Sequence, residues 1–399
     1  MNRVQEIRKE RNITQVQLAK YAGISRKYLS NVENQLANPS VDVAFRISTA
    51  LSVDIDKIFF DVPKSNITVY PKPLRYIDLF CGIGGFRYAS KGAFDKLGIN
   101  GKCVFSSDID KYAQQAYEAN FGEKPVGDIT KVDAESIPDF DLLFGGFPCQ
   151  AFSIAGYRQG FGDEKGRGEL FFELVRMLEA RRPRVALFEN VKNLAGHDNG
   201  NTFRVICEQL DLLGYHYTSQ VLNAMNYGNM AQNRERIYIV AFRDSEDFNK
   251  FHWPLPIPLM TTVKDIIDFN KKVDEKYYYT EGKYKGDIYE LLVEATKNDD
   301  LKNPAIYQWR RKYVRQNKSG VVPTLTANQG EGGHNVCIVK TKNGLRKMTP
   351  RECFNTQGFP KDYKLPKKQS DARLYKQAGN SVCVPVIRRI ATSILEAME

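Results

Sequence analysis

Residues 74–86 read LRYIDLFCGIGGF, and this stretch decides the fold of most of the chain. The short apolar run at 74–80 is typical of a buried strand, and three glycines follow it directly. Glycines at the end of a strand let the backbone approach a nucleoside-bearing ligand closely. The chain contains no phosphate loop of the form G-x-x-x-x-G-K-[ST], which argues against ATP hydrolysis.

Short apolar segments and amphipathic segments alternate from this point to residue 243. We predict strands at 74–80, 103–109, 141–147, 184–191 and 236–242, and helices at 86–98, 111–122, 170–180 and 202–214. This alternation predicts an α/β fold with a doubly wound, Rossmann-like parallel sheet, which binds its ligands at the carboxyl ends of the strands. The alternation is lost beyond Arg243 and does not return until residue 350.

Acidic residues follow the next strand and the loop behind it. Asp108 ends the second predicted strand and is placed to hydrogen-bond ribose hydroxyls. Asp128 lies in the following loop and could accept a hydrogen bond from an adenine amino group, while Phe80 could stack on the ring. Together these residues predict an adenosyl cofactor without a pyrophosphate.

A cysteine follows the third predicted strand, in the sequence GGFPCQ at 145–150. A thiolate at this edge of the sheet is a strong nucleophile if its pKa is lowered or a proton acceptor is near. The alternative, a small core residue, is the usual fate of a lone cysteine. The turn and the hydrophilic, glycine-rich loop at 153–168 favour an exposed Cys149 beneath a lid that can close over a substrate.

Two further strands carry charged residues. Glu189 lies at the end of 184–191, where a buried setting could keep a carboxyl protonated so that it serves as an acid. Arg234 and Arg236 are two residues apart at the start of the next strand, so both could reach one site. The alternative for the arginines is a surface ion pair with Glu235.

Residues 1–62 have the pattern of a small helical domain. Thr14 followed by Gln17 predicts a capping box, Gly23 a tight turn, and Ser25 the start of a third helix. The spacing T-x-x-x-L-A-x-x-x-G-I-S resembles the phage-repressor family of helix-turn-helix domains. This resemblance implies that the third helix binds DNA, through Arg26, Lys27, Tyr28 and Asn31. The alternative is a helical docking module that does not touch DNA.

The 399 residues carry 58 Lys+Arg and 47 Asp+Glu, a net charge of +11. Ten basic residues against one acid give residues 302–350 a charge of +9. This cluster indicates nucleic-acid binding, although a solvated loop is the alternative. Seven scattered cysteines without a C-x-x-C pair argue against a disulfide scaffold or a zinc site, and no segment reads as a signal peptide or membrane span. We therefore expect a cytoplasmic protein without a metal.

From residue 74 to the C-terminus the chain resembles the DNA (cytosine-5)-methyltransferase family of the bacterial restriction–modification type. The matching blocks are DLFCGIGGF, SSDID, GDIT, GGFPCQAFSIAG, ENVKNL, QNRERIYIV, RECFNTQGFP and QAGNSVCVPV, in family order. One departure is Asp108, where many members have glutamate. Asp108 is shorter but can hold the same hydroxyls.

The resemblance implies that the Cys149 thiolate adds to C6 of a cytosine flipped out of duplex DNA. Glu189 would act on ring N3, Arg236 on the O2 side, and Arg234 near the nucleophile or the backbone. Gln150 and Ser153 would belong to the lid. The methyl donor would be S-adenosylmethionine, bound by a set of residues from several strand ends: Phe80, Gly82, Gly84, Asp108, Ile109, Asp128, Ile129, Pro148 and Asn380.

The resemblance also divides the chain into parts. These are a helix-turn-helix domain (1–62), a linker (63–73), a catalytic domain (74–243), a target-recognition domain (244–347) and a C-terminal part (348–399) that returns to the catalytic domain, with one helix at 374–398. The recognition domain looks similar to those that read GC-rich sites such as CCGG or CCNGG, and its DNA-binding candidates are Arg310, Arg311, Lys312, Thr324, Thr326 and Asn328.

The implied partners are duplex DNA and, functionally, a cognate restriction endonuclease. The enzyme would act as a monomer, with a dimer through the first domain when that domain regulates transcription. Two alternatives stay open: a transcription regulator with a vestigial catalytic half, and a tRNA cytosine methyltransferase. An amino-group methylase is disfavoured, because the chain has no D-P-P-Y or N-P-P-Y block.

Overall fold

The computed structural model describes residues 2–11, 13–37, 39–51, 53, 55–59, 72–148, 170–284, 286–310, 312–329 and 336–399. The chain forms two compact units, Met1–Val69 and Tyr70–Glu399, which are described separately. None of the helices in these described ranges combines the length and apolar character needed to cross a membrane.

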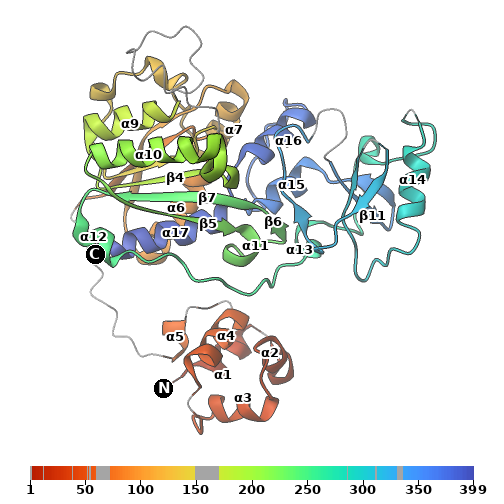
Figure 1. Ribbon diagram of the computed structural model, residues 1–399. Helices are drawn as coiled ribbons and strands as arrows, with labels where there is room; N and C mark the ends of the chain where they lie inside the picture. Colours follow the sequence, from red (N-terminus) through yellow and green to blue (C-terminus); the bar gives the residue numbers. More distant parts are fainter. Residues whose placement is uncertain are drawn as a thin grey trace. The chain divides into compact units, whose positions relative to one another are not determined.

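The first unit is a small helical domain (Figure 1). Its helices are α1 (Val4–Glu10), α2 (Gln15–Tyr21), α3 (Arg26–Glu33), α4 (Val41–Leu51) and α5 (Ile55–Phe59), the last of which the sequence did not predict. The capping box of Thr14 and Gln17 is present, and the Ser25 hydroxyl accepts a hydrogen bond from the Tyr28 amide. Both predicted helix starts are therefore confirmed.

A buried ion pair holds the first unit together. Arg8 Nε lies 2.6 Å from Glu33 Oε1, which joins α1 to α3, and Gln15 Nε2 donates to the same carboxylate. Apolar residues of all five helices form the core of this unit. The packing fixes α3 through one face and leaves its other residues available to solvent.

The second unit is built on a six-stranded sheet with the order β2-β1-β3-β4-β7-β5 (Figure 1). The strands are β1 (Leu74–Leu79), β2 (Gly101–Ser107), β3 (Leu142–Gly145), β4 (Val185–Val191), β5 (His216–Asn223) and β7 (Glu235–Phe242). The first four run parallel, so their carboxyl ends meet at one edge.

Two features of this sheet differ from the prediction. β7 runs antiparallel to both β4 and β5, because only 224–234 connect it to β5, and that connection is too short for a parallel crossover. β5 itself was not predicted. It is an edge strand with the polar sequence HYTSQVLN, which lacks an apolar run.

Helices cover both faces of the sheet, as the doubly wound fold requires. α6 (Gly85–Leu97), α7 (Lys111–Phe121) and α17 (Val384–Ala397) share one hydrophobic core with Tyr76 and Phe144 of the sheet. α9 (Leu170–Arg181) and α10 (Asn201–Leu212) share the other with Ile77 and Leu143. Neighbouring residues of one strand thus enter opposite cores. Short elements complete this part: η1 (Ile129–Lys131), η2 (Ala134–Ser136), η3 (Lys192–Gly200), α11 (Ala224–Tyr227) and α12 (Ser245–Lys250).

The prediction of one helix at 374–398 was wrong. The structure has two helices, α16 (Asp371–Asn380) and α17, separated by 381–383. Pro385 lies in the first turn of α17, where its missing N–H is not needed, whereas it would interrupt a continuous helix.

Residues between α12 and α15 (Pro350–Thr356) form a small lobe around a four-stranded sheet of order β12-β11-β8-β9. Its strands are β8 (Tyr307–Trp309), β9 (Val314–Gln316), β11 (Cys337–Thr341) and β12 (Gly344–Lys347); α13 (Val263–Ile266), η4 (Glu275–Tyr277) and α14 (Ile288–Ala295) accompany them. A separate strand, β10 (Val322–Pro323), pairs with β6 (Gln232–Asn233) beside the large sheet.

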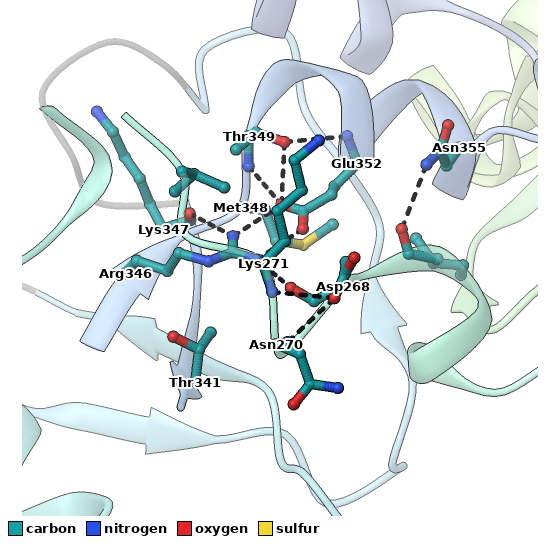
Figure 2. A network of polar contacts seen from close by, with 12 residues as sticks. Asp268, Asn270, Lys271, Thr341, Arg346, Lys347, Met348, Thr349, Glu352 and Asn355 are labelled. Atoms are coloured by element: carbon teal, nitrogen blue, oxygen red, sulfur yellow. Dashed lines mark hydrogen bonds and ion pairs between the residues drawn. The ribbon is translucent and has the colours of Figure 1, made fainter. Parts of the chain in front are cut away.

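A buried ion pair joins this lobe to α15. Figure 2 shows Arg346, at β12, reaching the carboxylate of Glu352. Nη1 and Nη2 lie 2.8 and 2.7 Å from the two carboxylate oxygens, and Nη2 also donates to the carbonyl of Asp268. Glu352 completes the capping box with Thr349 at the start of α15.

Candidate functional site

The turn after β1 has the backbone conformation of a tight ligand-binding loop. Phe80, Gly82 and Gly84 all have positive φ angles, of 54°, 53° and 81°. A side chain at Gly84 would collide with the ring of Phe121, so this position needs glycine. At Gly82 no atom lies within 4 Å of the position that a Cβ atom would occupy, and this open space fits the close approach of a ligand.

Asp108 lies against this turn. Its Oδ2 accepts a hydrogen bond of 2.7 Å from the Gly82 amide, and its Oδ1 accepts one from Asp110. Burial raises the pKa of Asp108, and these two bonds act in the opposite direction. Next to it the apolar side chain of Ile109 is 72% exposed at the sheet edge. An acid held beside an exposed apolar side chain fits a ribose and the face of an adenine ring.

Asp128 and Ile129 behave differently from one another. The Thr130 hydroxyl donates to Asp128 Oδ1 over 2.7 Å and lowers the pKa of this carboxyl, which therefore stays an acceptor. The side chain of Ile129 is buried in the core, and Arg176 donates to its carbonyl. Only Asp128 presents a side-chain acceptor for an adenine amino group.

The segment after β3 leads to the predicted nucleophile. Phe147 is buried, and its carbonyl accepts a hydrogen bond of 3.0 Å from Asn190 Nδ2 of β4. Pro148, the next residue, is exposed. Cys149, Gln150 and Ser153 lie outside the described residues. The prediction did not include Asn190, although it lies in the quoted ENV block.

Glu189 and Arg236 come together at the ends of β4 and β7. Arg236 Nε lies 3.2 Å from Glu189 Oε1, and the two side chains are 13% and 11% exposed. Among the described residues no group hydrogen-bonds Glu189 Oε1. The pair thus presents a buried carboxyl whose Oε1 is ion-paired with a guanidinium but makes no hydrogen bond among the described residues, and such a carboxyl can exchange a proton with a ring nitrogen.

Arg234 has a different environment from Arg236. Its guanidinium is buried and donates to the carbonyls of Leu325, Gly379 and Ser381. Burial lowers the pKa of Arg234 to about 10, so the side chain remains a cation at neutral pH. These contacts tie the start of β7 to the 325–326 segment and to the α16–α17 turn, which indicates a positioning role. The predicted Asn380 is exposed at this turn.

The TLTA sequence at 324–327 contacts the same turn. A side chain at Gly379 would collide with the Thr326 backbone, so glycine permits this close approach. Thr324 donates its hydroxyl hydrogen bond to the Asn233 carbonyl, and Thr326 donates to Asn328 Oδ1 over 2.9 Å.

An open cleft of about 570 Å³ lies between the ends of β4 and β7 and the small lobe. It brings Arg236 together with three of the predicted DNA-binding residues, Arg310, Thr324 and Thr326. Lys312 is exposed outside the cleft lining, and Arg311 lies outside the described residues. The prediction missed Asn193, Asn233, Gln308, Arg315 and Asn317, which also line the cleft. The alternation of apolar and polar residues within 306–317 is the sequence pattern that could have identified Gln308, Arg315 and Asn317.

In the first unit, α3 buries Leu29 and Val32. The predicted DNA-binding residues Arg26 and Lys27 are exposed, and Tyr28 and Asn31 are partly exposed. Across the described part of the chain, no three His, Cys, Asp or Glu side chains gather in a group that could hold a metal ion.

Comparisons with known proteins relate both units of the chain to known families. Residues 74–396 match the model for C-5 cytosine-specific DNA methylases, and residues 4–58 match a helix-turn-helix model. The chain is 53% identical over 326 residues to the type II methyltransferase M.Bsp6I of Bacillus sp. (strain RFL6), which covers 82% of this chain and 99% of the relative. It is 41% identical to the type II methyltransferase M.HhaI of Haemophilus parahaemolyticus, covering 80% and 94%. A crystal structure of S. pombe Dnmt2 methyltransferase has the same fold, with a TM-score of 0.60 at 20% identity over 82% of this chain and 99% of that one.

Proposed function

The chain belongs to the C-5 cytosine-specific DNA methylases, as a type II enzyme of the restriction–modification kind, and we propose that it methylates C5 of a flipped-out cytosine in a short duplex DNA site. The observation that carries this proposal is the Glu189–Arg236 pair beside a cleft whose other wall is basic. Such a cleft can take a base out of the duplex and hold its polar edge.

S-adenosylmethionine would supply an electrophilic methyl group, held by the turn at 80–84 with Asp108, Ile109 and Asp128. Asp108 would hold ribose hydroxyls, and Asp128 would accept from the adenine amino group. The open space at Gly82 and the exposed Ile109 support this fit. Pro148 and Asn380 would border the same site.

The Cys149 thiolate would add to C6 of the cytosine, and Glu189 would hold a proton at ring N3 so that the ring accepts the thiolate. Arg236 would hold the O2 side of the ring. Arg234 would act through the backbone segments that it joins. After methyl transfer a base removes the C5 proton and Cys149 leaves. Gln150 and Ser153 would close over the base, and Asn190 would position the chain just before the nucleophile.

Methyl transfer from labelled S-adenosylmethionine tests this assignment. We expect label in duplex DNA and none in tRNA, with a Cys149→Ala variant inactive and a Cys207→Ala variant, on α10, fully active. Label in tRNA alone would replace the assignment by an RNA methyltransferase. Label in DNA with Cys149→Ala would reject the covalent mechanism.

The small lobe would select the target, which we propose is GC-rich, of the CCGG or CCNGG type. Methylation of that site would protect the cell's own DNA, in the cytoplasm, from a cognate restriction endonuclease. We propose that the enzyme carries out this reaction as a monomer.

The first unit favours a second role. Its compact core and its exposed Arg26 and Lys27 support DNA binding by this unit. The bound unit would repress the chain's own restriction–modification genes, with a dimer as the regulatory form. Footprinting on the promoter of those genes tests this role. We expect protection that is lost in an Arg26→Ala, Lys27→Ala variant while methyl transfer persists. Protection confined to the methylation site would contradict it.

A further inference from the structure

The β8–β9 hairpin presents two chemically different faces. Tyr307 and, in part, Val314 pack into the hydrophobic cluster of the small lobe. The alternate positions, Gln308, Arg310 and Arg315, line the cleft together with Asn317. Because side chains alternate along a strand, this polar face is fixed by the apolar face behind it.

Gln308 is the centre of the polar face. It is 4% exposed, and it lies directly across the hairpin from Arg315. Its Oε1 accepts hydrogen bonds from Arg315 Nη2 over 2.6 Å and from Arg310 Nη2 over 3.3 Å. The buried Gln308 amide thus fixes the Arg315 guanidinium at the wall of the cleft.

We propose that Arg315, positioned by Gln308, reads guanine next to the target cytosine. This inference rests on the proposed function and assigns the base-specific contacts within it. Guanine presents two acceptors, O6 and N7, in the major groove, and an arginine fork matches them.

A phosphate offers the same acceptor chemistry, but the position of Arg315 favours a base. Arg315 lines the cleft that contains Arg236, whose guanidinium lies against Glu189. Lys312 is exposed at the tip of the hairpin, outside the cleft lining. A long flexible cation there suits a phosphate, whereas side chains anchored on a buried amide suit a base edge.

Methylation of a randomised duplex library followed by bisulfite sequencing tests the proposal. The full chain is compared with Arg315→Ala, Arg315→Lys, Gln308→Met and the matched control Lys312→Ala. The salt dependence of DNA binding is measured for each variant. Arg315→Lys keeps the charge but loses the fork, so it separates base reading from phosphate contact.

We expect Arg315→Ala and Arg315→Lys to lose the preference for guanine at one position by about tenfold or more while still methylating cytosine. Gln308→Met should weaken the guanine preference at the same position, and Lys312→Ala should lower the affinity for all DNA sites alike. An unchanged site preference in Arg315→Lys, with a salt slope reduced by about one in Arg315→Ala, would assign a phosphate contact and overturn the proposal. A wild-type chain that methylates no cytosine would instead overturn the proposed function, and this inference with it.

Discussion

Arg236 Nε lies 3.2 Å from Glu189 Oε1, across two neighbouring antiparallel strands of the large sheet. The ion pair holds the Glu189 carboxyl at the carboxyl end of β4. The next residue, Asn190, donates a hydrogen bond from its side-chain amide to the Phe147 carbonyl. The chemistry of the proposed site therefore depends on a contact between two strands rather than on any single loop.

Replacing Glu189 tests its role in proton transfer. We expect Glu189→Gln to lower kcat for DNA methylation by about 10²- to 10⁴-fold, because an amide cannot exchange a proton with the ring. Binding of S-adenosylmethionine, measured by calorimetry, should change little. Glu179→Gln, an exposed position on α9, is the control and should keep full activity. A fully active Glu189→Gln would contradict the assignment.

Asp78 predicts a dependence of stability on pH. This residue of β1 is fully buried, both its carboxylate oxygens lack hydrogen-bond partners among the described residues, and burial raises its pKa to about 8. The folded protein therefore binds a proton that the unfolded chain releases above its value of 3.8. This bound proton contributes to the free energy of unfolding. The contribution is full below pH 4 and is lost as the pH rises to about 8.

Urea unfolding at pH 5 and pH 8 measures this effect. Asp78→Asn should flatten the decline of the free energy of unfolding with pH, by at most about 1.4 kcal/mol for each pH unit. Asp95→Asn, at an exposed site on α6, should leave the decline as in the wild type. A decline that is equally steep in Asp78→Asn would show that this carboxyl is not the source.

The junction in Figure 2 predicts a strong coupling between two residues. Arg346→Met leaves the Glu352 carboxylate buried without its partner, which should cost about 3–5 kcal/mol of unfolding free energy. The double variant Arg346→Met, Glu352→Gln should recover part of that loss. A double-mutant cycle on the exposed pair Glu246 and Lys250 is the control and should give less than about 1 kcal/mol. Equal coupling in the two cycles would contradict the role of burial.

The basic hairpin predicts the salt dependence of DNA binding. Neutralising Arg310, Arg311 and Lys312 together should flatten the plot of log affinity against log salt by about 0.9 for each phosphate that the variant no longer neutralises. Cofactor affinity should remain near that of the wild type. Lys102→Ala, on the edge strand β2, should keep the original slope. Loss of cofactor binding with an unchanged slope would show the assignment to be wrong.

The positions along the chain of five of the six strands, and of the acidic residues at their ends, were predictable, because apolar runs followed by glycine or acid are local patterns. The direction of β7 and the existence of β5 were not. The first depends on the length of a connection, and the second is a polar edge strand without an apolar run.

Contacts between segments that are distant in the sequence also could not be predicted from local sequence patterns. Arg234 was expected near the nucleophile or the backbone, and its observed partners at Leu325 and Ser381 are far along the chain. Arg315 lies opposite Gln308 because of the register of the β8–β9 hairpin. This register depends on the turn at 310–313, and the alternation of side chains in the sequence does not give the position of that turn.

Bisulfite sequencing of DNA from cells that express the chain tests the central claim most directly, because it reports the modified base and its sequence context together. We predict that cytosines in one short, GC-rich site resist conversion, and that they convert fully in cells expressing Cys149→Ala. Complete conversion in cells that express the wild-type chain would contradict the account, as would protection that survives Cys149→Ala.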